Sequence, residues 1–145
     1  MVKALVITPV KDSIDNTMET IKAVHSSRIA VRHVVYNDFS TAATKEILEA
    51  NKEQYAYELV HLEDLTTNPS PNYKLVLQDA QRRALADEVP LVIVESDVEV
   101  KASTFEELLD FEGRYERIGL LGAMTVDRDN EINFPYLKFK NYTNS

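Results

Sequence analysis

Residues 4 to 36, ALVITPVKDSIDNTMETIKAVHSSRIAVRHVVY, contain a short apolar run, a segment of helical periodicity and a second short apolar run. Four apolar residues of the middle segment share one face of a helix: Ile14, Met18, Ile21 and Val24. Asp12 or Ser13 precedes this segment and is the expected cap of the helix. A helix between two short β-rich runs is typical of a βαβ unit, in which the two strands are parallel.

The alternation of apolar runs and helical segments continues along the chain. The predicted strands are Ala4–Thr8, Val31–Tyr36, Glu58–Leu62, Leu91–Val94 and Ile118–Met124. The buried stripes of a second and a third helix are predicted to be Ala43, Ile47 and Leu48, and Val76, Leu77, Ala80 and Ala84. Residues 103 to 106, STFE, fit a capping box that opens a fourth helix. We therefore expect an α/β fold with a three-layer α/β/α architecture and a mainly parallel sheet.

Composition and charge narrow the possible functions. The chain has 145 residues and 44% hydrophobic content, which predicts one domain over residues 1–145. Its net charge is −8 and its 16 basic residues are scattered, so nucleic acid is not an expected partner. The chain has no cysteine, and its three glycines all come late, which excludes thiolate metal sites and an N-terminal P-loop or dinucleotide fingerprint. No apolar run reaches the roughly 18 residues of a membrane span, so we expect a soluble, cytoplasmic protein.

Polar residues come directly after three of the predicted strands. These stretches are TPVKD at 8 to 12, NDFS at 37 to 40 and ESD at 95 to 97, and a predicted loop, TTNPSPN, spans 66 to 72. In open parallel sheets, ligands bind outside the carboxyl ends of the strands. The functional site is therefore expected at this edge of the sheet.

The acidic residues at this edge each allow two interpretations. If the strand continues through VIVESDVEV, 92 to 100, then Glu95, Asp97 and Glu99 point to the same side, either as a solvated strand end or as oxygen ligands for Mg²⁺ or Mn²⁺. Asp38 is placed either to bond a base or sugar, or to cap the next helix. The three histidines show no ligand pattern and are interpreted as structural residues.

The order and separation of these motifs resemble the family 2 glycosyltransferases, which are inverting enzymes with the nucleotide-diphospho-sugar transferase fold, a Rossmann-like fold. ITPVKD at 7 to 12 is similar to the IPVYN-like run that ends the first strand in that family. NDFST at 37 to 41 is similar to VDDGST, with Phe39 in place of Gly. ESD at 95 to 97 is similar to the D-x-D motif, with Glu95 in place of the first Asp. The resemblance covers about residues 3 to 135.

The resemblance implies a nucleotide-diphosphate sugar donor, with a UDP-sugar favoured, a divalent Mg²⁺ or Mn²⁺ cofactor and a sugar or glycan acceptor that the sequence does not identify. Asp97 would bind the metal, with Glu95 sharing the metal or bonding ribose. Pro9 and Val10 would line the base pocket, and Asp38 would bond the base edge, with Asn37 beside it. The full set of implied nucleotide-binding residues is Thr8, Pro9, Val10, Asn37, Asp38, Lys74, Glu95 and Ser96.

The sequence departs from the family pattern in two places. The predicted third helix reads LQDAQRRAL where family members often have an A-R-N-x-G-like segment. An inverting transfer also needs a base to deprotonate the acceptor hydroxyl, and no motif in the chain supplies one, so we expect the base in a segment beyond Ser145. The alternative functions are a non-catalytic nucleotide-sugar-binding domain and a phospho-receiver domain. The receiver is disfavoured because Asp12 and Asp97 lie 85 positions apart.

Overall fold

The computed structural model describes residues 1–127 and 129–133, and a four-stranded sheet lies at its centre. The strands are β1 (Ala4–Val10), β2 (Val31–Asn37), β3 (Tyr57–His61) and β4 (Leu91–Ile93). Their spatial order is β3-β2-β1-β4, and every neighbouring pair is parallel. The parallel sheet and four of the five predicted strands are confirmed.

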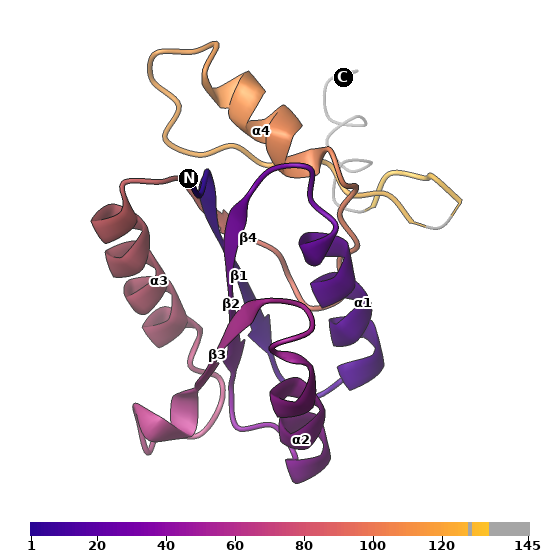
Figure 1. Ribbon diagram of the computed structural model, residues 1–145, viewed down its shortest axis with the longest axis vertical. Helices are drawn as coiled ribbons and strands as arrows, with labels where there is room; N and C mark the ends of the chain where they lie inside the picture. The colour runs from indigo at the N-terminus through magenta and orange to yellow at the C-terminus, as the bar shows by residue number, and fades with distance from the viewer. Residues whose placement is uncertain (128, 134–145) are drawn as a thin grey trace, which may run out of the picture. The chain divides into compact units, whose positions relative to one another are not determined.

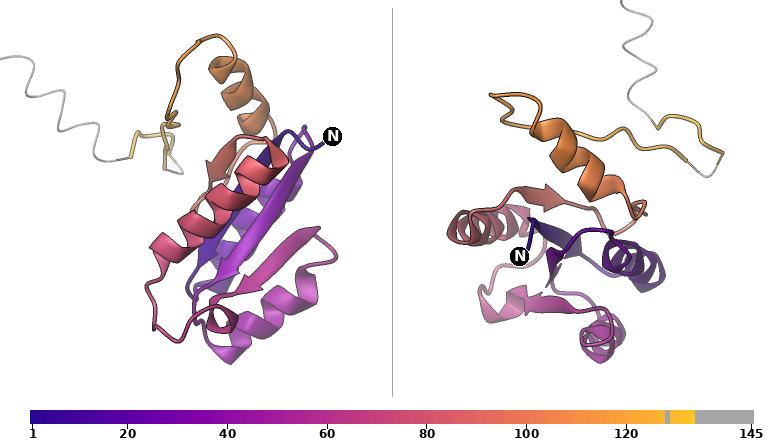
Figure 2. Two further views of the ribbon diagram at one scale, coloured as in Figure 1. Left: turned by 90° about the vertical axis from the view of Figure 1, so that its left-hand side faces the viewer. Right: turned by 45° about the horizontal axis from the view of Figure 1, so that its top comes forward.

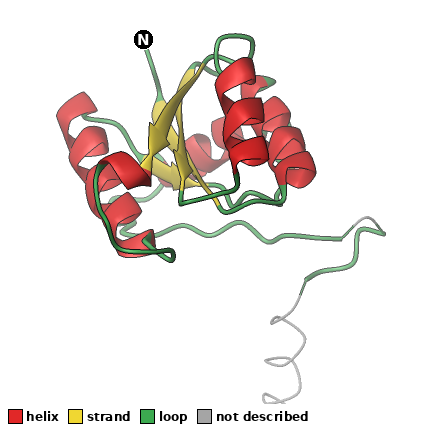
Figure 3. Ribbon diagram, turned by 90° about the horizontal axis from the view of Figure 1, so that it is seen from below, coloured by secondary structure: helices red, strands yellow, loops and turns green. Residues whose placement is uncertain are grey.

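Helices cover both faces of this sheet. They are α1 (Ile14–His25), α2 (Ala42–Asn51) and α3 (Tyr73–Asp87). A short 3₁₀ helix, η1, spans Leu62–Asp64, and a fourth helix, α4, spans Thr104–Glu112. Figure 1 shows α3 on one face of the sheet and α1 and α2 on the other. Seen from below in Figure 3, the strands lie between these helices. The expected three-layer α/β/α architecture is confirmed.

Two apolar clusters fill the spaces between the layers. The first packs α3 on the sheet and contains Leu5, Ile7, Val34, Tyr36, Leu62, Val76, Ala80 and Ala84. The second packs α1 and α2 on the other face and contains Val10, Met18, Ile21, Val35, Leu48 and Tyr57. Burial of apolar area at about 25 cal/mol per Å² makes such clusters the main stabilising term of a fold of this kind. Figure 2 shows α3 lying along its face of the sheet.

The buried face of α2 differs from the predicted one. Ala43 and Ile47 are exposed, and the residues that face the core are Thr44 and Leu48. Thr44 can occupy a buried position because its hydroxyl lies 3.3 Å from the Thr41 hydroxyl and 3.4 Å from Asp12 Oδ1. Burying a hydroxyl costs little free energy when the hydroxyl has hydrogen-bond partners. The buried face of α2 is therefore rotated relative to the predicted apolar face.

The start of α4 also differs in detail from its prediction. The helix begins at Thr104, and Ser103 contributes its carbonyl, which accepts from Glu107 N at 2.9 Å. The Thr104 hydroxyl accepts a hydrogen bond from Lys101 N at 3.0 Å, in the turn before the helix. The helix start was therefore correctly predicted, whereas the capping box was wrong, because no described hydrogen bond joins the side chain of Ser103 or of Glu106 to the backbone of the other.

Contacts divide the chain into two compact units, Met1–Glu107 and Leu108–Ser145. In the second unit the predicted strand Ile118–Met124 is wrong, because its described backbone is not in a strand. Leu120 is 94% exposed, and the one strand-like pairing described in the unit is the isolated bridge between Val126 and Ile132. Gly119 and Gly122 weaken strand formation at these positions, and a strand needs a pairing partner to persist. Among the residues that the structure describes, no helix is both long and apolar enough to cross a bilayer.

Candidate functional site

The carboxyl ends of β1, β2 and β4 lie at the same edge of the sheet, because all neighbouring pairs are parallel. Val10 pairs with Asn37 at the end of β1 and β2, so the residues that follow them lie close together. On β4 the last pair is Ile7–Ile93, and Val94 N donates to Ile7 O at 2.9 Å before the chain leaves the sheet at Glu95. The three predicted motifs are thus brought to one edge.

The loops after β1 and β2 are cross-linked to each other. The Lys11 ammonium donates to the carbonyl of Phe39, and Asp12 N donates to Ser40 Oγ at 2.9 Å. Asp12 Oδ1 accepts from Thr41 N at 2.8 Å, which holds the pKa of Asp12 below its usual value. These contacts fix the two loops as one surface.

Asp12 and Ser13 do not cap α1 as predicted. Ser13 occupies the N-cap position of α1 but makes no side-chain cap hydrogen bond, and its φ is 50°. The Asp12 carboxylate instead accepts a hydrogen bond from Thr41 N, at the N-cap residue of α2. A carboxylate at this position bonds a free N–H group and interacts favourably with the positive end of the helix dipole. The partner lies on a neighbouring βα unit, and local sequence patterns do not reveal such partners.

Asp38 is nearly buried and strongly hydrogen bonded. Its Oδ2 accepts from Ser70 Oγ and from Asn72 N, both at 2.8 Å, and its Oδ1 accepts from Asn72 Nδ2 at 2.8 Å. Burial by itself raises the pKa of Asp38, but the hydrogen bonds from Asn72 and Ser70 outweigh it, and the pKa lies below its usual value. Asp38 is therefore an ionised carboxylate. It does not cap the next helix, α2, but bonds the N-cap residue of α3.

The side chain of Asn37 is used inside the protein. Its Nδ2 donates to His61 Nδ1 at 2.9 Å, and its Oδ1 accepts from Ser40 N at 3.3 Å. His61 Nε2 in turn lies 2.8 Å from Glu49 Oε1. Asn37 is fully buried, so in this arrangement its amide orients the loop that carries Asp38.

The predicted residues of β1 separate into buried and exposed positions. Thr8 is fully buried, and its hydroxyl lies 3.0 Å from His33 Nε2. Val10 is 1% exposed and packs in the core cluster beneath α1. Pro9 is half-buried and Lys11 is exposed. At the end of β1, Pro9 and Lys11 are therefore the side chains that a ligand can reach, and Lys11 was not among the predicted site residues.

The acidic motif after β4 forms a turn. Val98 N donates to Glu95 O at 3.1 Å, so residues 95 to 98 are not extended, and the expected alternation of Glu95, Asp97 and Glu99 onto one side is wrong. Glu95 and Asp97 are exposed, and Ser96 is half-buried. β4 is shorter than the predicted strand and pairs with β1 over only three residues, and the chain turns soon after it.

The donor set at this turn suits a hard cation that keeps other oxygens in its shell. Within residues 1–127 and 129–133, no three His, Cys, Asp or Glu side chains come together as a metal-binding group. Mg²⁺ and Mn²⁺ are commonly bound by one or two carboxylates, with phosphate and water oxygens completing the shell. The two exposed carboxylates of Glu95 and Asp97 fit this pattern, whereas an all-protein cage does not.

Tyr73 is a further residue at this edge, and no sequence motif points to it. Its hydroxyl donates to Glu95 Oε1 at 3.2 Å. Lys74, which the resemblance implied, is exposed in the first turn of α3, and no described hydrogen bond or ion pair joins it to the other candidate residues. The neighbouring Tyr73, not Lys74, makes the observed contact with the acidic turn.

Phe39 adopts a backbone conformation that explains one departure from the resembling family. Its φ is 55°, in the left-handed region that L side chains rarely adopt and glycine adopts freely. This is the position at which the family pattern has glycine. Phe39 thus takes the backbone conformation that glycine adopts freely, and its side chain packs against the core cluster beneath α3.

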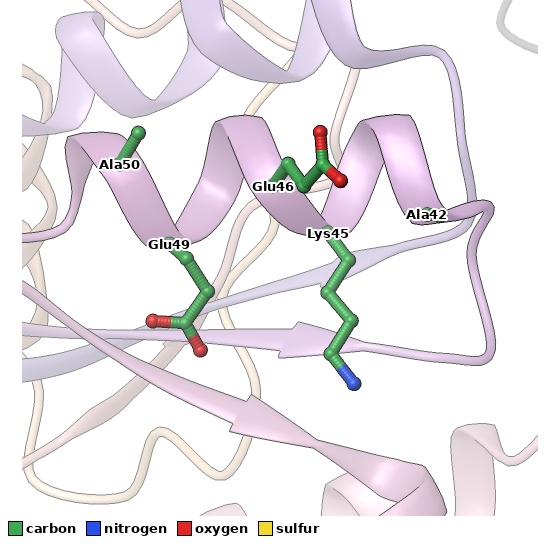
Figure 4. Close-up of a pocket in the computed structure, with 5 residues that line it drawn as sticks. All are labelled: Ala42, Lys45, Glu46, Glu49 and Ala50. Carbon is green, nitrogen blue, oxygen red and sulfur yellow. The ribbon is translucent and has the colours of Figure 1, made fainter.

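Two surface hollows lie on other parts of the first unit. Figure 4 shows the larger, of about 540 Å³, along α2, lined by Ala42, Lys45, Glu46, Glu49 and Ala50. The second, of about 280 Å³, is lined by residues that include His25, Arg28 and His33. None of the predicted site residues lines either of these two hollows.

Comparison with known proteins agrees with this architecture. No family model matches the sequence, and no curated protein matches it. Among solved structures, TarS 1-349 of S. aureus in complex with UDP has a TM-score of 0.55 and 16% identity over 85% of this chain and 38% of that one. The mannosyltransferase PcManGT of Pyrobaculum calidifontis, in complex with GDP-Man and Mn²⁺, has a TM-score of 0.54 and 15% identity over 74% of this chain and 31% of that one. The chain has the fold of these glycosyltransferases.

The expected nucleotide-diphospho-sugar transferase fold is confirmed by these structures. The chain spans less than two fifths of their length: 38% for TarS 1-349 without ligand, for example. Identities of 15 to 18% establish the fold alone. The assignment to family 2 and the inverting mechanism remain predictions.

Proposed function

We propose that this chain binds a nucleotide-diphosphate sugar at the carboxyl edge of its sheet, as the donor-binding part of a family 2 glycosyltransferase that passes the sugar to a hydroxyl acceptor. The observation that carries the proposal is that an ionised Asp38 and the exposed carboxylates of Glu95 and Asp97 follow parallel strands that end on the same side of the sheet. In open α/β sheets this edge is where nucleotides bind.

The nucleoside end of the donor is assigned to Pro9 and Asp38. A carboxylate offers about four lone-pair positions, and Asp38 uses three of them for Ser70 and Asn72. The remaining position accepts a base N–H or a ribose hydroxyl. Pro9 supplies a rigid apolar surface at the end of β1, and Lys11 supplies positive charge close to Asp38. A UDP-sugar is the favoured donor.

The diphosphate end is assigned to Glu95 and Asp97, with Ser96 between them. These residues would hold Mg²⁺ or Mn²⁺ together with the phosphate oxygens. When bound, the cation neutralises charge on the leaving diphosphate. PcManGT, which shares the fold, was solved with GDP-Man and Mn²⁺, and this supports the choice of cation. An inverting transfer also needs a base that removes the acceptor proton, and we assign it to no residue of this chain.

Calorimetric titration with UDP and with GDP, each with and without Mn²⁺, tests the proposal. We expect binding of at least one nucleotide diphosphate, strengthened by Mn²⁺. The absence of binding by either nucleotide under both conditions would exclude the proposed function.

A pair of charge-matched variants locates the cation. Asp97→Asn should remove the Mn²⁺-dependent part of the affinity and leave the metal-independent part. Glu53→Gln changes charge equally at an exposed position beyond the end of α2 and should leave both parts intact. Equal loss in both variants would indicate a general charge effect and not a site at Asp97.

A further inference from the structure

Two consecutive residues, Asn72 and Tyr73, contact candidate site acids that follow two different strands. Asn72 binds both carboxylate oxygens of Asp38, through its backbone N and its Nδ2, each at 2.8 Å. Tyr73 donates its hydroxyl to Glu95 Oε1 at 3.2 Å. The loop that enters α3 therefore joins the acid after β2 to the acid after β4, and β1 lies between these two strands in the sheet.

The residues that make this connection are held by a rigid element. Asn72 is the N-cap of α3, and its Nδ2 also donates to Asn68 O at 3.1 Å. The buried face of α3, Val76, Ala80 and Ala84, packs in the core cluster on the sheet. One turn after Val76, Asp79 is 7% exposed and accepts a hydrogen bond from Tyr36 at 2.7 Å. The positions of Asn72 and Tyr73 are thus fixed relative to the strands.

The two acids differ in how much they need such support. Asp38 is 8% exposed and has three hydrogen bonds from Ser70 and Asn72. Glu95 is exposed on a turn, and a free glutamate there has many rotamers. The Tyr73 hydroxyl engages Oε1 and leaves Oε2 available. A ligand that is already oriented binds a cation at lower entropic cost.

We propose that Tyr73 is a positioning residue, which orients the Glu95 carboxylate toward a divalent cation. The inference rests on the proposed function for the identity of the site, and it adds a residue that neither the sequence motifs nor the resemblance selects. Through Asn72, the same loop sets the distance between the nucleoside end and the diphosphate end of the site.

Binding of Mn²⁺ alone, followed by the electron paramagnetic resonance signal of the free ion, tests this role directly. In Tyr73→Phe, which retains the ring and removes the hydroxyl, we expect the Mn²⁺ affinity to fall about tenfold, the lower end of the range for groups that orient metal ligands. Tyr115→Phe removes a hydroxyl at an exposed position in the second unit and should leave the affinity unchanged.

A double-mutant cycle separates positioning from a general structural effect. Once Glu95→Gln has removed the carboxylate, Tyr73→Phe should have no further effect on Mn²⁺ affinity. Additive losses would overturn the inference, as would an unchanged affinity in Tyr73→Phe or a wild-type protein that binds no Mn²⁺ with or without nucleotide. Mn²⁺ binding that depends on Tyr73, without binding of UDP or GDP, would reject the proposed function and retain the Tyr73–Glu95 coupling. Nucleotide binding by a protein whose Mn²⁺ affinity is unchanged in Tyr73→Phe would retain the proposed function and reject the Tyr73–Glu95 coupling.

Discussion

Replacement of His33 by Gln should change how the stability of this protein depends on pH. His33 is 4% exposed, and burial lowers its pKa to about 3, far below the ordinary value of roughly 6.5. Between these two values the unfolded chain binds a proton that the folded protein does not. Stability contributed by the neutral imidazole is therefore lost as the pH falls below about 6.5.

The size of the effect follows from the two pKa values. For a single group with pKa about 3 when folded and about 6.5 when unfolded, the free energy of unfolding falls by about 2 kcal/mol between pH 7 and pH 5. Glutamine has no proton to gain in this range, and its amide retains a group that can bond the Thr8 hydroxyl. His33→Gln should therefore lack this part of the pH dependence, whatever constant amount of stability it loses.

Urea unfolding at pH 7, 6 and 5, followed by circular dichroism, measures the effect. Subtracting the variant from the wild type at each pH cancels the carboxylates and the other histidines, which both proteins share. His25→Gln, a change at an exposed histidine, should retain the wild-type slope. If wild type and His33→Gln lose stability in parallel between pH 7 and pH 5, then His33 does not stay neutral in the folded state.

Three further substitutions test individual contacts by urea or thermal unfolding. Tyr36→Phe removes the donor that lies 2.7 Å from Asp79 Oδ2, and because Asp79 is buried we expect a loss of about 1–2 kcal/mol in the free energy of unfolding; no loss would mean that Arg82 and Arg83, which also donate to Asp79, satisfy this carboxylate alone. Asp12→Ala leaves Thr41 N without its acceptor and should lower the urea midpoint, and an unchanged midpoint would show that water replaces the carboxylate. Glu88→Gly relieves a left-handed residue (φ 52°) at the end of α3 and should raise the melting temperature by about 3 °C, whereas a decrease would show that the strain is absent.

The layers of the fold could be predicted because each element carries its own periodic signal. In α1, Met18, Ile21 and Val24 recur at helical spacing and are all buried. The apolar run at Leu91 is short and bounded, as is typical of a strand in a parallel sheet, and it forms β4, a half-buried strand at the end of the sheet order. These signals depend on neighbours a few residues away, which a single sequence contains in full.

The parts that were not predicted depend on partners far apart in the sequence. Asp12 serves the start of α2, 29 positions later, and Tyr73 reaches Glu95 across 22 positions. The apolar run from Ile118 onward has the composition of a strand, yet composition does not show whether a pairing partner is present. The residues of the candidate edge were found because strand ends are visible in the sequence. The contacts that orient these residues were not predicted.

The cross-links between the loops after β1 and β2 affect the dynamics of the candidate site. Loop amides usually exchange with solvent quickly, but Asp38 N donates to Val10 O at 2.8 Å and Thr41 N to Asp12 Oδ1 at the same distance. The Asp38 amide should therefore exchange on the timescale of the sheet, because its acceptor is a carbonyl of β1. The Thr41 amide should exchange faster than that of Asp38, because rotation of the Asp12 side chain alone releases it. The proposed nucleotide would therefore meet a backbone whose entropy was already lost when the domain folded.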